Sequence, residues 1–508
     1  MLSISRRELL KRAGGLGALA FIPVLARCSG PKDTLPVYDY EGSLGPDDLF
    51  AEGVASGDPL IDSIILWTHI NPGDMGGGDI EVFVEVSETP DFERRILAGA
   101  HMARPDKDYC LKFDATELDP DTTYYYRFFS LGQQSPTGRT KTAPEQAQHL
   151  RFGVCSCSNY AFGYFHAYWH LSQRQDIDAV LHLGDYIYEY ASGGYGILRE
   201  YEPAHEITSL TDYRLRYLQH RRDPDLQEAH RQHPWITVWD DHEFANNPFI
   251  GGADNHDPEV EGDWSDRVAA AIQAYDEWMP TRVGESRRIY RSFVFGNLVR
   301  LHMLDIKYPL ISPVDGEELT MLGEEQASWL DGQIADTQAT WMILGQQQVF
   351  ATGRSAWDDH PESRLRIKTA AEAAGVRNVV VLTGDIHQAL CSDIAEDPDN
   401  DYNPTTGQGS WGVEMVCTSI TSPGTTRDLS SQPHKHWADA EFRGYLVLDV
   451  TPERVQGDWF GFGDSGKFLY QRPDEIWLKG WVTLEGDNHL TESSTPSEPK
   501  TKPPKLAP

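Results

Sequence analysis

Cysteine is scarce in this sequence, with six residues among 508. One of them, Cys28, follows the N-terminal apolar stretch, and the other five are scattered over the rest of the chain. An odd and scattered set of this kind does not indicate a disulfide framework. Hydrophobic residues make up 40% of the chain, which excludes global disorder, and a length of 508 residues predicts two folded domains.

Basic residues are also few, since 44 Lys and Arg stand against 78 Asp and Glu, a formal net charge of −34. Stable nucleic-acid binding requires Lys and Arg to neutralise phosphates, so this charge excludes nucleic acid as a stable partner. An acidic surface attracts divalent cations and repels phosphorylated molecules at long range. A site for phosphate esters in this chain therefore needs local positive charge, and metal ions are the obvious source.

Long apolar runs are missing beyond the N-terminus, so no stable membrane span is predicted. The N-terminus itself begins with Ser5-Arg6-Arg7-Glu8-Leu9-Leu10-Lys11, followed by a mostly apolar stretch from Ala13 to Ala26. Its apolar part is shorter than the roughly 20 residues that cross a bilayer. We interpret residues 1–28 as a twin-arginine signal peptide.

This signal predicts the twin-arginine translocase as the export partner and a periplasmic or extracellular location. Cys28 leaves anchoring as a lipoprotein open, although Arg27 stands where a lipidation motif needs a small residue.

Residues 43–144 have the pattern of a small all-β domain. The segments 64–68 and 80–86 are rich in β-branched and aromatic residues, and the second alternates cleanly. A turn around Pro120 then precedes the tyrosine-rich segment 124–128. Short strands separated by turns favour a sandwich, and this arrangement is similar to a fibronectin type III-like domain.

From about Leu150 the pattern changes to short apolar strands, each ending in a polar cluster, with helical segments between them. Buried strands interspersed with helices predict an α/β fold, a layered core with helices outside. We assign residues 150–470 to this second domain and 471–508 to a C-terminal extension. The tail from Thr491 onwards lacks apolar periodicity and is predicted to be disordered.

The polar clusters at the strand ends carry groups that bind metals. In open α/β sheets ligands collect at the carboxyl ends of the strands, which is where these clusters occur. Taken singly, each has an ordinary explanation as a turn, a helix cap or a buried polar residue. Four strand ends of one domain that all carry such groups instead predict a multi-metal hydrolytic site. The candidate ligands are Cys157, Asp185, Tyr188, Asp241, Asp385 and His387.

His242 follows one of these candidate ligands directly. A histidine beside a metal site is suited to protonating a leaving oxygen or to stabilising charge in the transition state. We therefore predict His242 as the catalytic residue.

Several motifs together give the sequence a resemblance to a known family. They are Gly53-Val54-Ala55-Ser56-Gly57-Asp58-Pro59, Leu66-Trp67-Thr68, Ser156-Cys157, Gly184-Asp185-Tyr186-Ile187-Tyr188-Glu189, Trp239-Asp240-Asp241-His242-Glu243, Asn246-Asn247 and Thr383-Gly384-Asp385-Ile386-His387. The chain resembles the PhoD-type alkaline phosphatases and phosphodiesterases of the calcineurin-like metallophosphatase superfamily.

The resemblance implies a metallophosphatase core that hydrolyses phosphate mono- and diesters with metal-activated water. It implies one Fe³⁺ and two Ca²⁺, with Cys157 and Tyr188 on the iron and Asp185 bridging to calcium. Asp241, Asp385 and His387 are further ligands by the same resemblance. The sequence departs from the family pattern at Lys307, where an arginine is usual.

Two other functions remain open at this point. A purple-acid-type phosphatase also combines a tyrosine ligand with a β-sandwich domain, but needs a Gly-His-x-His-like ending where this chain has Gly384-Asp385-Ile386-His387. A non-catalytic secreted binding protein would use the metals for stability alone and would leave no coordination position for water.

Overall fold

The computed structural model describes residues 35–508 except 284–287, 312–319, 352, 354–355, 426–431 and 464–469. The predicted signal peptide, residues 1–28 with Cys28, lies outside the described residues. No helix of the described part combines the length and apolar character that crossing a membrane requires.

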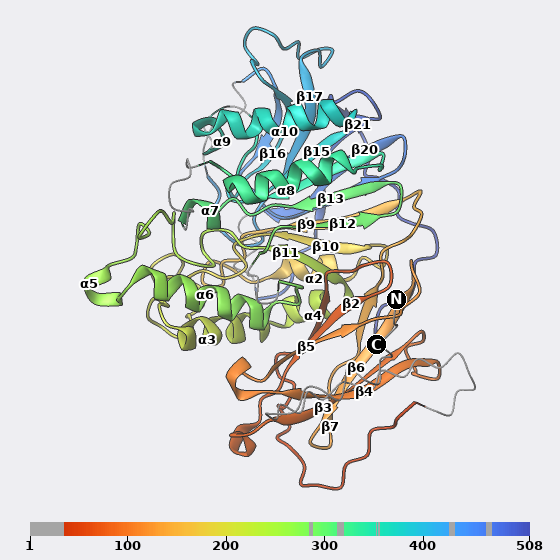
Figure 1. The fold of residues 1–508 in the computed structure, drawn as a ribbon, viewed down its shortest axis with the longest axis vertical. Helices are drawn as coiled ribbons and strands as arrows, with labels where there is room; N and C mark the ends of the chain where they lie inside the picture. Colours follow the sequence, from red (N-terminus) through yellow and green to blue (C-terminus); the bar gives the residue numbers. More distant parts are fainter. Residues whose placement is uncertain are drawn as a thin grey trace, which may run out of the picture.

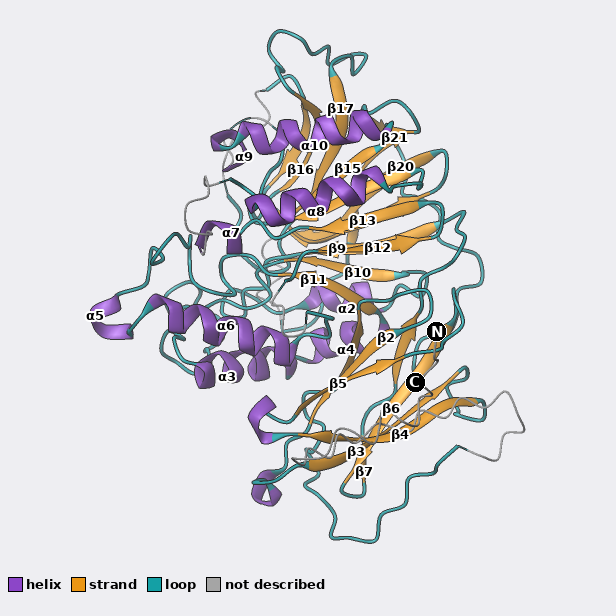
Figure 2. Cartoon of the chain, in the orientation of Figure 1, coloured by secondary structure: helices purple, strands orange, loops and turns teal. Residues whose placement is uncertain are grey.

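Two large β-sheets pack face to face and form the centre of the molecule (Figures 1 and 2). Within the described residues the larger sheet has ten strands in the order β22-β21-β20-β19-β9-β10-β11-β1-β2-β5. In chain order these are β1 (Val54–Gly57), β2 (Ile64–His69), β5 (Cys110–Ala115), β9 (Leu150–Cys155), β10 (Ala179–Leu183), β11 (Pro234–Val238), β19 (Phe442–Val450), β20 (Arg454–Gly463), β21 (Ile476–Leu484) and β22 (Thr491–Ser493).

The second sheet has seven strands in the described residues, in the order β12-β13-β14-β15-β17-β16-β18. They are β12 (Arg291–Phe295), β13 (Val299–Met303), β14 (Trp341–Gln346), β15 (Val379–Thr383), β16 (Ala389–Ala395), β17 (Ser410–Val416) and β18 (Lys435–Asp439). Strands β9, β10 and β11 of the first sheet pair in parallel, as do β13, β14, β15 and β17 of the second. Their carboxyl ends therefore meet at a common edge of each sheet.

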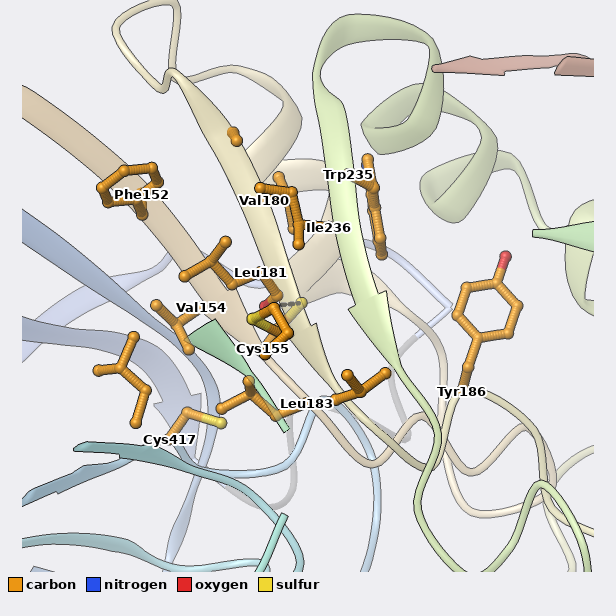
Figure 3. Close-up of a cluster of buried hydrophobic side chains, with 14 of the residues drawn as sticks. Phe152, Val154, Cys155, Val180, Leu181, Leu183, Tyr186, Trp235, Ile236 and Cys417 are labelled. Atoms are coloured by element: carbon orange, nitrogen blue, oxygen red, sulfur yellow. Dashed lines mark hydrogen bonds between the residues drawn. The ribbon is translucent and has the colours of Figure 1, made fainter. Parts of the chain in front are cut away.

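The core between the sheets is continuous and apolar. Phe152, Val154 and Leu181 of the first sheet belong to one buried cluster with Ile343 and Val380 of the second. Figure 3 shows the part of this cluster around β9, β10 and β11. Strands that are buried on both faces consist almost entirely of apolar residues, which explains the uninterrupted apolar runs in the sequence.

Helices cover the outer faces of the sandwich (Figure 2). Leu330 and Ile367, from α8 and α10, pack on Met342 and Val381 of the seven-stranded sheet. A second group, α2, α3, α4 and α6, lies at the other large sheet (Figure 1). The α-helices are α2 (His166–Ser172), α3 (Leu210–Arg221), α4 (Pro224–Gln232), α5 (Pro258–Glu261), α6 (Trp264–Trp278), α7 (Tyr308–Ile311), α8 (Gly323–Ala335), α9 (Ala356–Asp359) and α10 (Pro361–Ala374), with short 3-10 turns at Gly73–Met75 and Pro105–Lys107.

The N-terminal part is all-β, and it is joined to the central sheet. Its own five-stranded sheet in the described residues contains β3 (Ile80–Ser87), β4 (Arg95–Ala103), β6 (Thr123–Ser130), β7 (Gln133–Gln134) and β8 (Gly138–Lys141). The opposite layer of this sandwich is β1-β2-β5, and β1 pairs in parallel with β11. One sheet therefore runs without a break from the N-terminal sandwich into the second domain.

The prediction of a disordered tail from Thr491 onwards is wrong. Residues 491–493 form strand β22, and the chain then runs back to the N-terminal sandwich. There the hydroxyl of Tyr125 donates to Lys505 O at 2.7 Å, and Ala507 N donates to Gln232 Oε1 at 2.8 Å. These contacts join the tail to distant folded parts of the chain, and they leave no periodic apolar pattern in the sequence.

Candidate metal centre

The predicted ligands converge at the carboxyl ends of the parallel strands, on a cavity of about 680 Å³. Asp185 follows β10, Asp241 follows β11, and Asp385 and His387 follow β15. These four residues and His242 line the cavity, whereas Cys157 and Tyr188 are fully buried.

Four of the six predicted ligands adopt a left-handed backbone conformation. The φ angles are 61° for Cys157, 57° for Asp185, 61° for Asp385 and 53° for His387. Positive φ is uncommon for residues other than glycine and costs on the order of 1–3 kcal/mol, and it concentrates at functional sites. Each strand end therefore turns sharply, and the turn directs the next side chain to the common centre.

One group of donors contains the sulfur, phenol and imidazole ligands. Cys157, Asp185 and His387 each offer one ligand atom within 4.8 Å of the others. The hydroxyl of Tyr188 lies 3.1 Å from Asp185 Oδ2 and 3.2 Å from His387 Nε2. Nδ1 of His387 is 2.9 Å from the carbonyl oxygen of Pro423, which accepts its proton and leaves Nε2 as the metal-facing nitrogen.

The second group consists of carboxylates. Asp240, Asp241 and Asp385 bring one oxygen each within 4.8 Å of one another. Lys307 Nζ lies 2.8 Å from Asp240 Oδ1 and 3.5 Å from Asp241 Oδ1. Asp240 Oδ2 is buried and has no hydrogen-bond partner among the described residues. Asp185 links the two groups, because it also lies within 4.8 Å of Asp241 and His242.

The electrostatics of these groups call for cations. Burial, with the nearby charge of Asp185, raises the pKa of the Cys157 thiol and of the Tyr188 phenol well above their usual values. Burial also raises the pKa of Asp240 and of Asp385, which Lys307 only partly opposes. Thiolate, phenolate and imidazole suit a transition ion, and clustered carboxylates suit calcium. The residues present therefore fit a mixed metal centre.

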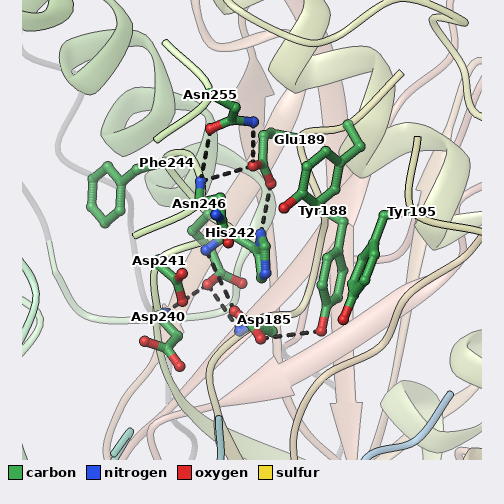
Figure 4. Close-up of polar contacts among 12 residues, drawn as sticks. Asp185, Tyr188, Glu189, Tyr195, Asp240, Asp241, His242, Phe244, Asn246 and Asn255 are labelled. Carbon is green, nitrogen blue, oxygen red and sulfur yellow. Dashed lines mark hydrogen bonds and ion pairs between the residues drawn. The ribbon is translucent and has the colours of Figure 1, made fainter. Parts of the chain in front are cut away.

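His242 is held by a buried carboxylate (Figure 4). Its Nδ1 lies 2.7 Å from Glu189 Oε2, and the other oxygen of Glu189 accepts from Asn255 Nδ2 at 2.7 Å. Burial alone would lower the pKa of His242, but Glu189, Asp185 and Asp241 together raise it well above its usual value. The carboxylates thus favour the protonated ring, and Nε2 is the nitrogen left for a ligand.

Aromatic rings flank this histidine on the cavity side (Figure 4). The ring centres of Tyr188 and His242 are 4.2 Å apart, and Tyr195 stacks against His242 at 6.2 Å with an interplanar angle of 26°. Tyr195 also lines the cavity. These rings restrict the orientation of the imidazole.

Glu243 holds in place the two turns that follow β10 and β11 and carry metal donors. Its carboxylate accepts backbone N–H bonds from Asp185 at 3.0 Å, Tyr186 at 2.5 Å and Asp240 at 2.7 Å. Burial and the neighbouring carboxylate of Asp185 raise the pKa of Glu243 to about 8. One side chain thus fixes the turns after β10 and β11 relative to each other.

The structure brings all six predicted ligands and His242 together. Asn246 and Asn247, whose roles the sequence left open, both line the cavity, and Asn247 N donates to Asp241 Oδ2 at 2.9 Å. Lys307 contacts the carboxylates Asp240 and Asp241. The sequence analysis missed Asp240 as a donor, although the consecutive Asp240-Asp241 pair was the available signal. It also missed the roles of Glu189, Tyr195 and Glu243, because only their partners in the folded structure reveal them.

Comparisons with known proteins show the family of this chain. The PhoD-like phosphatase family matches residues 152–459, and the N-terminal domain of PhoD-like phosphatases matches residues 42–144. Alkaline phosphatase D of Bacillus subtilis is 34% identical over an alignment that covers 90% of this chain and 84% of that protein. A solved structure of PhoD superposes with a TM-score of 0.80 at 32% identity, covering 91% of this chain and 94% of the other. This chain belongs to the PhoD-like phosphatase family.

Proposed function

We propose that this chain is a metal-dependent phosphoric ester hydrolase, an alkaline phosphatase or phosphodiesterase that releases phosphate with water as the nucleophile. The observation that carries the proposal is that the metal donors converge at one cavity, whose lining includes Asp185, Asp241, Asp385 and His387 together with the imidazole of His242. Membership of the PhoD-like family supports the same reaction class and argues against the purple-acid alternative. A purely structural role for the metals would not require the cavity that these residues line.

We assign one Fe³⁺ to the group of Cys157, Tyr188, Asp185 and His387, because sulfur, phenol and imidazole donors suit a transition ion. Two Ca²⁺ would be held on the carboxylate side by Asp185, Asp241 and Asp385, together with Asp240, which the sequence analysis did not select. When bound, such ions lower the pKa of a coordinated water and neutralise phosphoryl oxygens.

Side chains of the protein orient the reacting groups, and His242 supplies a proton. Glu189 holds Nδ1 of His242, so Nε2 is the atom that contacts the phosphoryl group or protonates the leaving oxygen. Tyr195 stacks on the ring and limits its rotation. The turns after β10 and β11 stay in place through Glu243, so the donors need no reorganisation when substrate binds.

The rim of the cavity bears on substrate preference. Asp358 and Asp359 line the cavity beside the metal donors, in a chain with a net charge of −34. Carboxylates at the entrance repel substrates that carry further negative charge away from the scissile phosphate. We therefore expect simple alkyl and aryl phosphate mono- and diesters to be better substrates than polyphosphates.

The proposal is tested with the purified mature chain and two chromogenic substrates, an aryl phosphate monoester and the matching diester. We expect hydrolysis of at least one of them at alkaline pH, and the ratio of the two kcat/KM values assigns the mono- or diester preference. Absence of hydrolysis of both substrates by protein that contains its metals would contradict the proposed function.

Tyr188 gives a spectroscopic prediction for the iron assignment. A phenolate bound to Fe³⁺ produces a visible charge-transfer band, so the wild-type protein is expected to be coloured and Tyr188→Phe to lose the band. Tyr195→Phe is the matched control, since Tyr195 lies beside Tyr188 with ring centres 5.8 Å apart. A band that persists in Tyr188→Phe would assign it to another ligand.

Export is the remaining part of the proposal. The twin-arginine motif in residues 1–28 supports passage through the twin-arginine translocase to the periplasm or the exterior, with Cys28 as the position where a lipid anchor would be attached. That route carries folded cargo, which suits a protein whose metals bind before export.

A further inference from the structure

A second group of possible metal ligands lies away from the active-site cavity. Asp393 is on β16, His436 is on β18, and His489 is in the turn between β21 and β22. Each offers one ligand atom within 4.8 Å of the others, and none of the three lines the cavity. Asp393 lies about 13 Å along β16 from the strand end that follows His387.

The three side chains face one another closely. His489 Nδ1 is 2.6 Å from Asp393 Oδ2, and His436 Nε2 is 3.1 Å from Asp393 Oδ1. Asp393 is fully buried, and the side chains of His436 and His489 are 11% and 14% exposed. The cluster is thus largely withdrawn from solvent while one side remains open to water and small ions.

One nitrogen of this cluster lacks a well-directed hydrogen bond. His436 Nε2 is buried and lacks a properly directed hydrogen bond to any described residue, although Asp393 Oδ1 is 3.1 Å away. A cation held by this nitrogen and the carboxylate would replace the poorly directed contact with two coordinate bonds.

A second layer of contacts orients the carboxylate. The hydroxyl of Tyr402 donates to Asp393 Oδ2 at 2.8 Å, and Leu490 N donates to Asp393 Oδ1 at 2.9 Å. Hydrogen bonds of this kind fix ligating carboxylates in metal sites. His436 is fixed from another side by Trp481, whose ring centre is 5.2 Å away.

We propose that Asp393, His436 and His489 form a second metal site, which binds a divalent transition ion of the Zn²⁺ type. Two imidazoles with one carboxylate suit such an ion, while calcium and magnesium prefer oxygen ligands throughout. Three protein ligands leave a fourth position for water. The site joins β16, β18 and the turn before β22, so a bound ion fastens the C-terminal segment to the seven-stranded sheet.

The experiment measures Zn²⁺ binding by equilibrium dialysis and elemental analysis on the wild-type holoprotein and on the double variant His436→Gln/His489→Gln. We expect the wild type to bind one Zn²⁺ per chain more than the double variant. His205→Gln is the matched control, because His205 forms an ion pair with Asp212 outside the proposed site and its side chain is 67% exposed. It is expected to bind as much Zn²⁺ as the wild type.

Thermal unfolding supplies a second measurement. Zn²⁺ at 100 times its dissociation constant is expected to stabilise the wild type and His205→Gln, so their Tm rises. The Tm of the double variant is expected to stay unchanged. Aryl phosphate hydrolysis by the double variant, unchanged from the wild type, shows that it is folded. Equal Zn²⁺ binding by wild type and double variant would overturn the site.

Should the double variant fail to fold, X-ray absorption at the zinc edge of the wild-type holoprotein loaded with Zn²⁺ decides the question. In the holoprotein the active-site ligands already hold their own ions, so the added Zn²⁺ reports on the proposed site. Scattering from two imidazoles supports the proposed site, and a spectrum without imidazole contradicts it.

Discussion

Asp185→Ala is expected to lower kcat/KM for an aryl phosphate by at least about 10³-fold, which corresponds to about 4 kcal/mol of lost transition-state stabilisation. We expect this large effect on kcat/KM because Asp185 is the only described residue shared by the Cys157/His387 group and the Asp241/His242 group. Its removal takes a donor from both sides of the centre at once. Steady-state kinetics and elemental analysis of the same preparation check the prediction, and we expect metal content to fall together with activity.

Asp359→Ala is the matched control for this substitution. It removes the same charge from the lining of the same cavity, but Asp359 belongs to neither donor group. We expect its kcat/KM to stay within about tenfold of the wild type, consistent with a change at an exposed site. An Asp185→Ala variant with normal metal content and more than a tenth of the wild-type activity would contradict the bridging role.

His242→Ala is expected to lower kcat by about 10²–10⁴-fold, the usual contribution of a positioned general acid or base. Unlike Asp185→Ala, it should leave the metal content unchanged, because we assign His242 to substrate rather than to a metal. The loss should appear mainly in kcat, since proton transfer and charge stabilisation act in the transition state.

Glu189→Gln separates the positioning of His242 from its presence. The amide keeps the shape of the side chain but removes the charge that holds Nδ1 of His242. We expect kcat to fall about 10–100-fold, as for other residues that orient a functional group.

A His242→Ala variant that hydrolyses the monoester at the wild-type rate would exclude the proposed role of His242 and leave the metals as the sole catalysts.

The family, the α/β fold and the all-β character of the N-terminal part could be predicted from the sequence, and all three are confirmed. Parallel strands buried on both faces leave uninterrupted apolar runs, and their carboxyl ends leave polar clusters, so Asp185 and Asp385 stood out at once. Convergence was predictable for the same reason, because such ends meet at one edge of a sheet. The metal identities and the role of each donor stay predictions.

Other features depend on contacts between distant segments and leave no local pattern. The pairing of β1 with β11, which joins the N-terminal strands to the central sheet, links residues about 180 positions apart. Glu243 and Glu189 act on partners that lie more than 50 positions away. The C-terminal tail is ordered by contacts with distant residues, such as that of Ala507 with Gln232, which composition alone does not reveal.

The central claim is that the cluster at the strand ends hydrolyses phosphate esters only with its metals bound. The most direct test measures aryl phosphate hydrolysis at alkaline pH by the wild-type protein before and after treatment with a calcium chelator, and again after Ca²⁺ is added back. We predict loss of activity on chelation and recovery on re-addition. Activity that survives removal of calcium, with the loss verified by elemental analysis, would contradict this account.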